Sequence, residues 1–314
     1  DVLEELVVIG RKRSNVEKVQ NIPLAVTVIS PAQLAIQGAA NIEDIETLSP
    51  NLVIDLATAG PGAGAMSIRG VSFDDVEKSF EPTVGVVIDG VFLGTNTAQL
   101  TNAFDFEQVE VFRGPQGTLF GRNTTGGTIN IQRSRPTGEA GARLNATIGD
   151  FGRQEFNAVV NLGVTENLAL KFFAYDRQTD GYYRNVTLNQ NVGGNHASNL
   201  GLTALFSAND RLEFLLTVEN QKIGGDPAGS SFSNNTDLVC QIPSFAGGAG
   251  GSEQCNRNLD EDLYKTFGNE PSFLEYDEDA VTLQVKYSLA NFELVSITGY
   301  RESDELVNTD FDAT

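Results

Sequence analysis

From residue 140 onward, apolar and polar residues alternate along the chain, and this alternation predicts β-strands whose two faces meet different surroundings. The stretches that show it are 142–148, 156–164, 168–174, 200–206, 212–218, 281–289 and about 292–300. Each stretch is close to the roughly 9–11 residues that a tilted strand needs to cross a membrane. We therefore predict about seven antiparallel strands in this part of the chain.

The joins between these stretches help to choose an architecture, because a soluble sandwich also has strands with one apolar and one polar face. The short joins are 165–167, 209–210 and 290–291, and the long ones are 178–197 and 222–278. Short turns at one end and long loops at the other are typical of an outer-membrane β-barrel. We expect residues 137–314 to form the N-terminal part of a transmembrane β-barrel, with long extracellular loops at 178–197 and 222–278.

The pattern of residues 21–136 is mixed and predicts an α+β domain. Residues 24–29 favour a strand, and Ser30 with Pro31 then starts a helix as its N-cap and first residue. Apolar residues at helical spacing predict a second short helix over 42–48.

A hairpin and a glycine-rich turn region complete this domain. The Asp89-Gly90 dipeptide lies between the β-branched runs 84–88 and 91–93, which is a strong hairpin signal. Residues 104–136 contain two strand-like runs around a turn region dense in glycine. Glycine supplies the positive φ angles and tight turns that such a region needs.

Composition limits the function classes. The chain has 314 residues, a formal net charge of −21 and a pI of about 4.3. This charge argues against a nucleic-acid partner, because a surface that binds phosphates needs clustered lysine and arginine. The mean hydropathy of −0.16 favours a soluble protein, but the short alternating segments of a membrane barrel give only a weak signal. No apolar run is long enough for a membrane-spanning helix, and the start at Asp1 suggests a processed product.

The sequence predicts no catalytic, metal or cofactor site, and we expect no enzyme. His196 is the only histidine, so a multi-histidine metal site within these residues is impossible. Residues 121–128 are rich in glycine but lack the Lys-Ser/Thr of a phosphate-binding loop. We expect Cys240 and Cys255, which share a polar stretch, to form a disulfide in an oxidising compartment. The alternative is two free thiols.

Four stretches resemble, in the expected order, motifs of the TonB-dependent outer-membrane receptor family. They are ELVVIG at 5–10, SIRGV at 67–71, EPTVGVVIDGV at 81–91 and VEVFRGPQGTLFGRNTTGGTINI at 109–131. The first resembles a TonB box, and the other three resemble parts of a plug domain. The resemblance implies a TonB box and linker at 1–20, a plug domain at 21–136 and the start of a barrel at 137–314.

The resemblance also implies roles for individual residues. The residues that would bind TonB by strand addition are Glu5, Leu6, Val7, Val8 and Ile9. The arginines that would seat the plug against barrel glutamates are Arg69 and Arg113. The candidates for a ligand-facing plug loop are Asp74, Asp75, Glu77, Lys78 and Phe80.

About seven strands cannot close around a plug, because outer-membrane transporters with a plugged lumen have about 22. An open sheet edge in lipid would leave backbone groups unpaired at a cost of several kcal/mol each. We therefore expect the chain to be part of a longer receptor.

The function that the resemblance implies is TonB-dependent active uptake of a scarce nutrient across the bacterial outer membrane, with a ferric siderophore as the first expectation. The expected partners are TonB with its inner-membrane energising complex, outer-membrane lipid and a small-molecule ligand such as a ferric siderophore. Uptake of glycans or plant-derived aromatics, a passive porin-like channel and a surface-binding protein stay open as alternatives.

Overall fold

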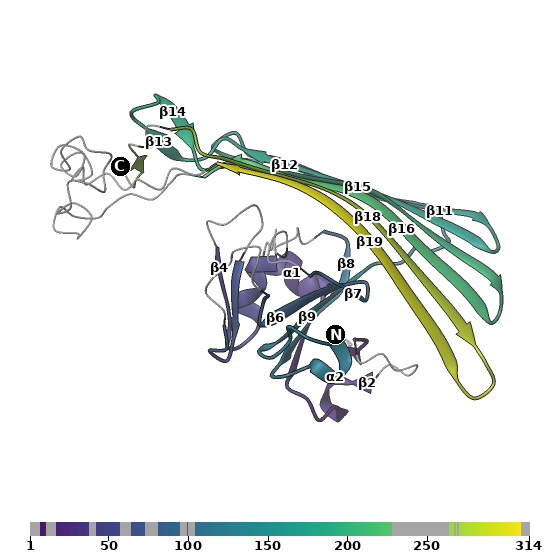
Figure 1. The fold of residues 1–314 in the computed structure, drawn as a ribbon. Coiled ribbons are helices and arrows are strands. Elements are labelled where there is room, and N and C mark those ends of the chain that lie inside the picture. The colour runs from purple at the N-terminus through teal and green to yellow at the C-terminus, as the bar shows by residue number, and fades with distance from the viewer. Residues whose placement is uncertain are drawn as a thin grey trace.

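The computed structural model describes residues 7–10, 17–37, 42–56, 64–72, 81–94, 99, 104–227, 264–266, 268 and 270–308. These residues form two parts: an N-terminal module of short strands and helices, and a curved sheet of seven long strands (Figure 1). The sheet arches over the module, which lies on its concave side (Figure 1).

The N-terminal module is built on a mixed sheet of five strands. In spatial order these are β3 (Val26–Ile29), β8 (Phe106–Arg113), β9 (Gly127–Arg133), β6 (Val84–Ile88) and β7 (Val91–Phe92). β6 runs parallel to β9, and the other neighbours are antiparallel. Buried β-branched residues of β6, β8 and β9 form the core together with apolar residues of the neighbouring elements, which removes their apolar surface from water. The predicted α+β organisation is confirmed.

The first helix of the module begins where the sequence predicts it. α1 (Pro31–Gln37) follows Ser30, whose Oγ accepts a hydrogen bond from the Gln33 N–H at 3.3 Å. Gln33 Oε1 in turn accepts one from the Ser30 N–H at 2.9 Å. This reciprocal capping satisfies N–H groups that a helix start leaves without partners.

The second helix, η2 (Ile42–Leu48), is a 3₁₀ helix. Its apolar residues recur every third position, and side chains three apart line up in a 3₁₀ helix. In the described ranges, no helix combines the length and the apolar character needed to cross a membrane.

Shorter elements complete the module. They are β1 (Val7–Val8) paired with β2 (Glu17–Lys18), η1 (Val19–Asn21), β4 (Leu52–Leu56) paired with β5 (Gly64–Ile68), and α2 (Gly117–Phe120). The hydrophobic pattern does not predict β4, because four of the five residues of its sequence LVIDL are apolar and do not alternate with polar ones.

The predicted hairpin between β6 and β7 is present. Asp89 has φ +50° and Gly90 has φ +84°. Two consecutive positive φ angles are what a type I′ turn requires, and this turn matches the twist of the flanking strands.

The seven long strands pair antiparallel with their neighbours, which confirms the predicted strand number. In spatial order they are β10 (Gly141–Ile148), β11 (Gln154–Thr165), β12 (Leu168–Thr179), β15 (Gly194–Asn209), β16 (Leu212–Asp226), β18 (Phe273–Ser288) and β19 (Glu293–Asn308). The tight turns after β11, β15 and β18 lie at one end of the sheet (Figure 1).

Several strands extend further than the apolar alternation indicated. β15 begins at Gly194, inside the stretch 178–197 expected as a loop, and β16 and β18 both reach into 222–278. The backbone ladder continues past the apolar residues because its hydrogen bonds do not depend on side-chain type. Three short strands lie within the long joins, at the end of the sheet opposite the tight turns. They are β13 (Tyr183–Asn185), β14 (Gln190–Val192) and β17 (Lys265–Thr266).

The large sheet exposes apolar side chains on one face and buries polar side chains on the other, which is the reverse of a soluble β-sandwich. Large apolar side chains lie exposed on the convex face, among them Phe156, Leu162, Phe172, Leu200, Phe206, Leu216, Val218 and Val281. Polar side chains are buried on the concave face, among them Lys171, Thr203, Thr217, Glu219, Gln221, Glu278 and Thr282. An apolar outside and a polar inside are the pattern of an outer-membrane barrel wall.

Candidate functional site

Three strand ends of the N-terminal module meet at the edge that faces the large sheet. β8 runs antiparallel to β9 and β6 runs parallel to it, so the start of β8 lies beside the ends of β6 and β9. Asp105 precedes β8, Asp89 follows β6, and Arg133 ends β9. Backbone bonds join these ends, since the Asp89 N–H donates to the Ile131 carbonyl and the Ser134 N–H to the Asp105 carbonyl, at 3.0 and 2.9 Å.

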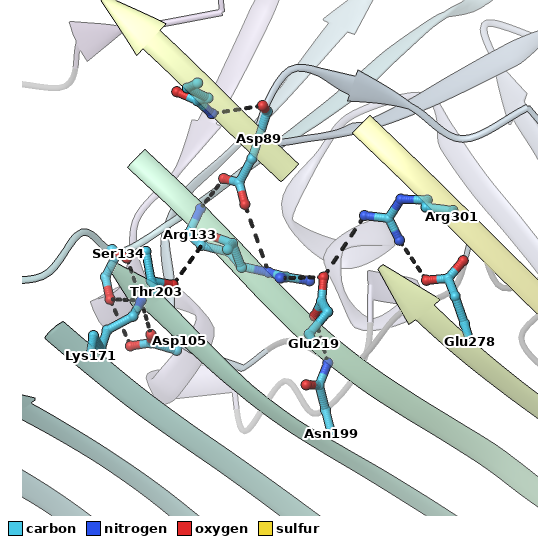
Figure 2. Close-up of polar contacts among 12 residues, drawn as sticks. Asp89, Asp105, Arg133, Ser134, Lys171, Asn199, Thr203, Glu219, Glu278 and Arg301 are labelled. Atoms are coloured by element: carbon cyan, nitrogen blue, oxygen red, sulfur yellow. Dashed lines mark hydrogen bonds and ion pairs between the residues drawn. The ribbon is translucent and has the colours of Figure 1, made fainter. Parts of the chain in front are cut away.

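Arg133 is the centre of this edge (Figure 2). Its Nη1 lies 2.6 Å from Oε1 of Glu219 in β16, and its Nε lies 4.0 Å from Oδ2 of Asp89. The Arg133 backbone N–H also donates to Asp89 Oδ1 at 3.0 Å. The side chains of Arg133 and Glu219 are only 11% and 4% exposed. A buried ion pair therefore joins the module to the sheet.

The ion pairs continue across the concave face of the sheet (Figure 2). Nη1 of Arg301 lies 2.5 Å from Glu278 Oε1, and its Nη2 lies 3.9 Å from Glu219 Oε1. The Asn199 amide donates to Glu219 Oε2 at 3.0 Å, and the Tyr276 hydroxyl donates to Glu278 Oε2 at 2.8 Å. Both carboxylates therefore have polar partners on each oxygen, which buried charges require.

A second cluster forms around Lys171 of β12, whose side chain is 1% exposed. Its Nζ lies 2.6 Å from Asp105 Oδ2 and 3.1 Å from Ser134 Oγ, and it also donates to the Ser134 carbonyl. Arg143 of β10 pairs with Asp105 Oδ1 at 3.1 Å. The Phe173 ring centroid lies 5.5 Å from Lys171 Nζ, which adds a cation–π contact.

We call the charged residues of both clusters the interface network. Its members are Asp89, Asp105, Arg133, Arg143, Lys171, Glu219, Glu278 and Arg301 (Figure 2 labels all except Arg143). The carboxylates and cations alternate in space, so each buried charge has an opposite charge beside it.

The turn between β6 and β7 also contacts the sheet through its backbone. Gln284 of β18 donates from Nε2 to the Asp89 carbonyl at 2.8 Å. A Cβ atom on Gly90 would lie 2.5 Å from Cδ1 of Ile297 in β19. A cavity of about 10 Å³ beside Asp89 is close to the size of one water molecule. The turn therefore fits closely against the sheet.

Burial dominates the electrostatics of Asp89. It raises the pKa of this carboxyl above its ordinary value, although the Arg133 guanidinium and its N–H act in the opposite direction. In the described part of the chain, no three or more His, Cys, Asp or Glu side chains are grouped as a metal site would need. The arrangement is suited to holding two parts of the protein together.

The N-terminal segment that the sequence assigned to TonB binding is described from Val7 to Gly10. Val7 and Val8 form β1, and Val8 is 2% exposed. The backbone N–H groups of Ile9 and Gly10 donate to the buried carboxylate of Glu110, at 2.6 Å to Oε1 and 2.9 Å to Oε2. This segment is thus docked on the module. Glu5 and Leu6 lie outside the described residues.

Arg69 and Arg113 both lie at the ends of strands. Arg69 follows β5 and has φ +56°, while Arg113 is the last residue of β8. The Arg113 Nε is buried without a hydrogen-bond partner. Among the described residues, neither arginine forms an ion pair, and their seating role stays a prediction. The expected ligand-facing residues Asp74, Asp75, Glu77, Lys78 and Phe80, and both cysteines, lie outside the described residues.

The sequence interpretation did not identify the interface network. The sequence predicts a turn at Asp89, and Glu219 directly follows the alternating stretch 212–218. A signal was present, because Lys171, Glu219 and Glu278 are charged residues inside strands with an apolar opposite face. Such residues are costly to bury without partners, so they indicate contact with another charged surface.

Comparison with known proteins agrees with this architecture. Residues 18–128 match the family model of the TonB-dependent Receptor Plug Domain. The chain is 32% identical over 155 residues to the Pesticin receptor of Yersinia pestis, covering 48% of this chain and 22% of that protein. It is 24% identical over 265 residues to the Catecholate siderophore receptor Fiu of Escherichia coli (strain K12), covering 84% of this chain and 32% of that protein.

Solved structures share the fold. The ferric yersiniabactin uptake receptor FyuA from Yersinia pestis superposes with a TM-score of 0.75 at 19% identity, covering 91% of this chain and 42% of that chain. The open form of the ferric-catecholate import receptor Fiu from E. coli K12 gives a TM-score of 0.69 at 20% identity, covering 92% and 40%. The chain thus spans less than half the length of these relatives. Residues 18–128 are a plug domain of the TonB-dependent receptor type, and they are followed by a seven-stranded sheet whose fold matches part of the barrel wall of these receptors.

Proposed function

We propose that this chain is part of a transporter that takes up a ferric siderophore across the outer membrane, driven by TonB. The observation that carries the proposal is a plug domain held inside a barrel wall by a buried network of ion pairs. The relatives suggest the ligand class, because they include receptors for ferric yersiniabactin and ferric catecholates.

In this proposal, the ligand binds at the end of the sheet that carries the long joins, and the candidate ligand-facing residues of the plug are Asp74, Asp75, Glu77, Lys78 and Phe80. TonB pairs with residues 5–9 by strand addition, whose main-chain hydrogen bonds give affinity with modest sequence demands. Force on this segment then rearranges the plug and opens a path through the barrel. Arg69 and Arg113 contribute to seating the plug through barrel carboxylates.

The interface network gives this mechanism a physical constraint. Breaking one partner of a buried ion pair costs about 3–5 kcal/mol, because the other charge is left without compensation. Removal of the whole plug would break several such contacts at once. We therefore expect the pulling force to remodel the part of the plug next to the N-terminal segment, while the edge at Arg133 stays in place.

The test is uptake of radioactive iron by cells that express the protein from its natural gene. Catecholate and phenolate ferric siderophores are supplied separately, with and without a proton uncoupler. We expect accumulation that stops with the uncoupler, and that is lost on deletion of residues 5–10 while surface binding remains.

The other outcomes identify the alternatives. Uptake that persists with the uncoupler would indicate a passive channel, and binding without any uptake would indicate a surface receptor. If neither siderophore class is bound and iron starvation leaves the protein's abundance unchanged, the ligand is a different nutrient. Growth on glycans or plant aromatics would then be compared between cells with and without the protein.

A further inference from the structure

The carboxylate of Glu110 is buried under the N-terminal segment. Glu110 lies in the middle of β8 and is 0% exposed. Its neighbours Val109 and Val111 point into the main core of the plug. Alternation along a strand places Glu110 on the opposite face of the sheet, and residues 7–10 cover it there.

Among the described residues, each hydrogen-bond partner of the Glu110 carboxylate is an N–H donor. Oε1 accepts from the Ile9 backbone at 2.6 Å and from Gln108 Nε2 at 2.6 Å. Oε2 accepts from the Gly10 backbone at 2.9 Å and from Asn130 Nδ2 at 2.8 Å. In the described part of the chain, no lysine or arginine forms an ion pair with Glu110. Two main-chain donors of the N-terminal segment are therefore part of what stabilises this buried charge.

The fit between the segment and the carboxylate requires glycine at position 10. A Cβ atom there would lie 2.3 Å from Glu110 Oε2, 2.7 Å from Asn130 Nδ2 and 3.1 Å from the Phe112 ring. Distances below 3.0 Å are not compatible with a real Cβ atom, so any other residue would move the segment or the carboxylate.

An apolar contact completes the docking site. Val8 is 2% exposed and belongs to a small apolar cluster with Ile22, Val26, Val28 and Phe112. Gln108 also donates to the Val7 carbonyl at 3.4 Å. The segment is thus held by its main chain and by one buried side chain.

We propose that Glu110 is a positioning residue for TonB capture, which anchors the N-terminal segment to the plug through the Ile9 and Gly10 N–H groups. This inference rests on the proposed function, because it assumes that residues 5–9 are the strand that TonB pairs with. A strand that adds to TonB needs its own main-chain groups and its side chains accessible. Docking at Glu110 and pairing with TonB therefore compete for the same few residues.

The experiment compares four proteins in detergent: the natural protein and the variants Glu110→Gln, Gly10→Ala and Glu107→Gln. Glu110→Gln keeps the shape but replaces one acceptor oxygen by an NH₂ group that faces other donors. Gly10→Ala leaves the carboxylate intact and removes the room for the segment. Glu107→Gln is the matched control, since Glu107 is an exposed glutamate on the same strand.

The first readout is hydrogen–deuterium exchange of the Ile9 and Gly10 amides. Hydrogen bonds to charged groups correspond to roughly a 10- to 100-fold change in an equilibrium constant. We expect Glu110→Gln and Gly10→Ala to speed exchange by at least about 10-fold, and Glu107→Gln to leave it unchanged. Exchange across β6 reports whether the plug stays folded. Unchanged exchange at Ile9 and Gly10 in both variants would overturn the anchor.

The second readout is binding of the purified C-terminal domain of TonB, with no other ligand present. We expect Glu110→Gln and Gly10→Ala to bind TonB about 10-fold more tightly than the natural protein. Deletion of residues 5–9 should abolish TonB binding in both variants. Faster exchange with unchanged TonB affinity would refute the competition. Faster exchange with no TonB binding by any of the proteins would instead refute the TonB-box assignment, and with it the proposed function.

Discussion

At the scale of single residues, the contact between plug and barrel depends on buried charges that come from distant parts of the chain. Arg133 and Lys171 are each almost fully covered, and each lies within 2.6 Å of a carboxylate oxygen. Replacing both partners of such a buried pair by apolar residues often leaves the stability of a protein unchanged. Removing only one partner is costly, because the other charge then stays buried without compensation. The interface network therefore holds the plug in one position against the barrel wall, and a single substitution in it should weaken that contact.

Lys171→Met should destabilise the plug within the barrel by about 3 kcal/mol, because it leaves Asp105 buried with fewer compensating donors. The value is at the low end of the expected range since Arg143 and Ser134 still contact Asp105. The measurement is the urea dependence of proteolytic cleavage of the plug in reconstituted protein.

Lys286→Met is the control for this prediction. Lys286 pairs with Glu293 at 2.8 Å, but its side chain is 44% exposed. Exposed pairs contribute about 0–1 kcal/mol, so the urea midpoint should barely change. Equal shifts for the two lysine variants would show that the Lys171 contact is not energetically special.

Glu110 should give the plug a characteristic pH dependence. Burial raises the pKa of this carboxyl above 4.5, although its N–H partners oppose the shift. The folded plug therefore binds this proton more tightly than the unfolded chain, and the Glu110 contribution to stability grows as the pH falls through the raised pKa towards 4.5.

The measurement compares urea midpoints of the natural protein and Glu110→Gln at about pH 7 and about pH 5. On acidification, the difference between the two should move in favour of the natural protein. A movement in favour of the variant would mean that the hydrogen bonds from Ile9, Gly10, Gln108 and Asn130 outweigh the effect of burial.

At the scale of elements, the hairpin of β6 and β7 is the part of the plug that reaches the barrel wall. Its turn has the φ angles of a type I′ turn, its backbone accepts a hydrogen bond from β18, and a Cβ atom on its glycine would clash with Ile297 of β19. Local turn chemistry and long-range packing therefore require the same residue at position 90.

Gly90→Ala should weaken the seating of this hairpin by about 1–2 kcal/mol. A left-handed backbone is unfavourable for alanine, and the added Cβ would lie 2.5 Å from Ile297. Hydrogen–deuterium exchange of the β7 amides measures the effect, and we expect faster exchange in the variant than in the natural protein.

Gly94→Ala is the matched control for the hairpin. Gly94 lies just after β7, and a Cβ atom there would meet nothing within 4 Å. Exchange in β7 should be the same in this variant as in the natural protein. If both alanine variants speed exchange equally, the contact with Ile297 is not what fixes the turn.

At the scale of the whole molecule, the sheet has its apolar face outside and its polar face towards the plug. Val218 lies near the middle of β16 and is 44% exposed on the convex side, while its neighbours Thr217 and Glu219 are buried on the concave side. This inversion only makes sense if the convex side faces lipid, where apolar side chains are at no disadvantage.

Val218→Lys should therefore impair insertion of the protein into the membrane. A lysine on the lipid face near the bilayer midplane costs about 2–4 kcal/mol. The fraction of protein that stays folded in a gel-shift assay after refolding into lipid vesicles measures the loss. Gln190→Lys, at an exposed position in β14, is the control and should refold like the natural protein.

The sequence by itself determined the long strands, the hairpin and the start of the first helix. Alternation with a period of two predicted the long strands, Asp89-Gly90 predicted the hairpin, and Ser30 with Pro31 predicted the start of α1. Each of these signals is local, because strand alternation, turn geometry and helix capping depend on residues only a few positions apart. The order of the motifs along the chain likewise predicted a plug ahead of a barrel, because each motif is a short local stretch.

Only the tertiary structure decided which residues meet. Alternation shows that two faces of a strand differ, but it does not say which face turns towards the plug. The pairing of Arg133 with Glu219 depends on strand order, register and the way the sheet curves around the module. Glu110 and Gly10 likewise come together only when the N-terminal segment folds back onto β8. Contacts between residues this far apart in the chain follow from packing, which no local pattern encodes.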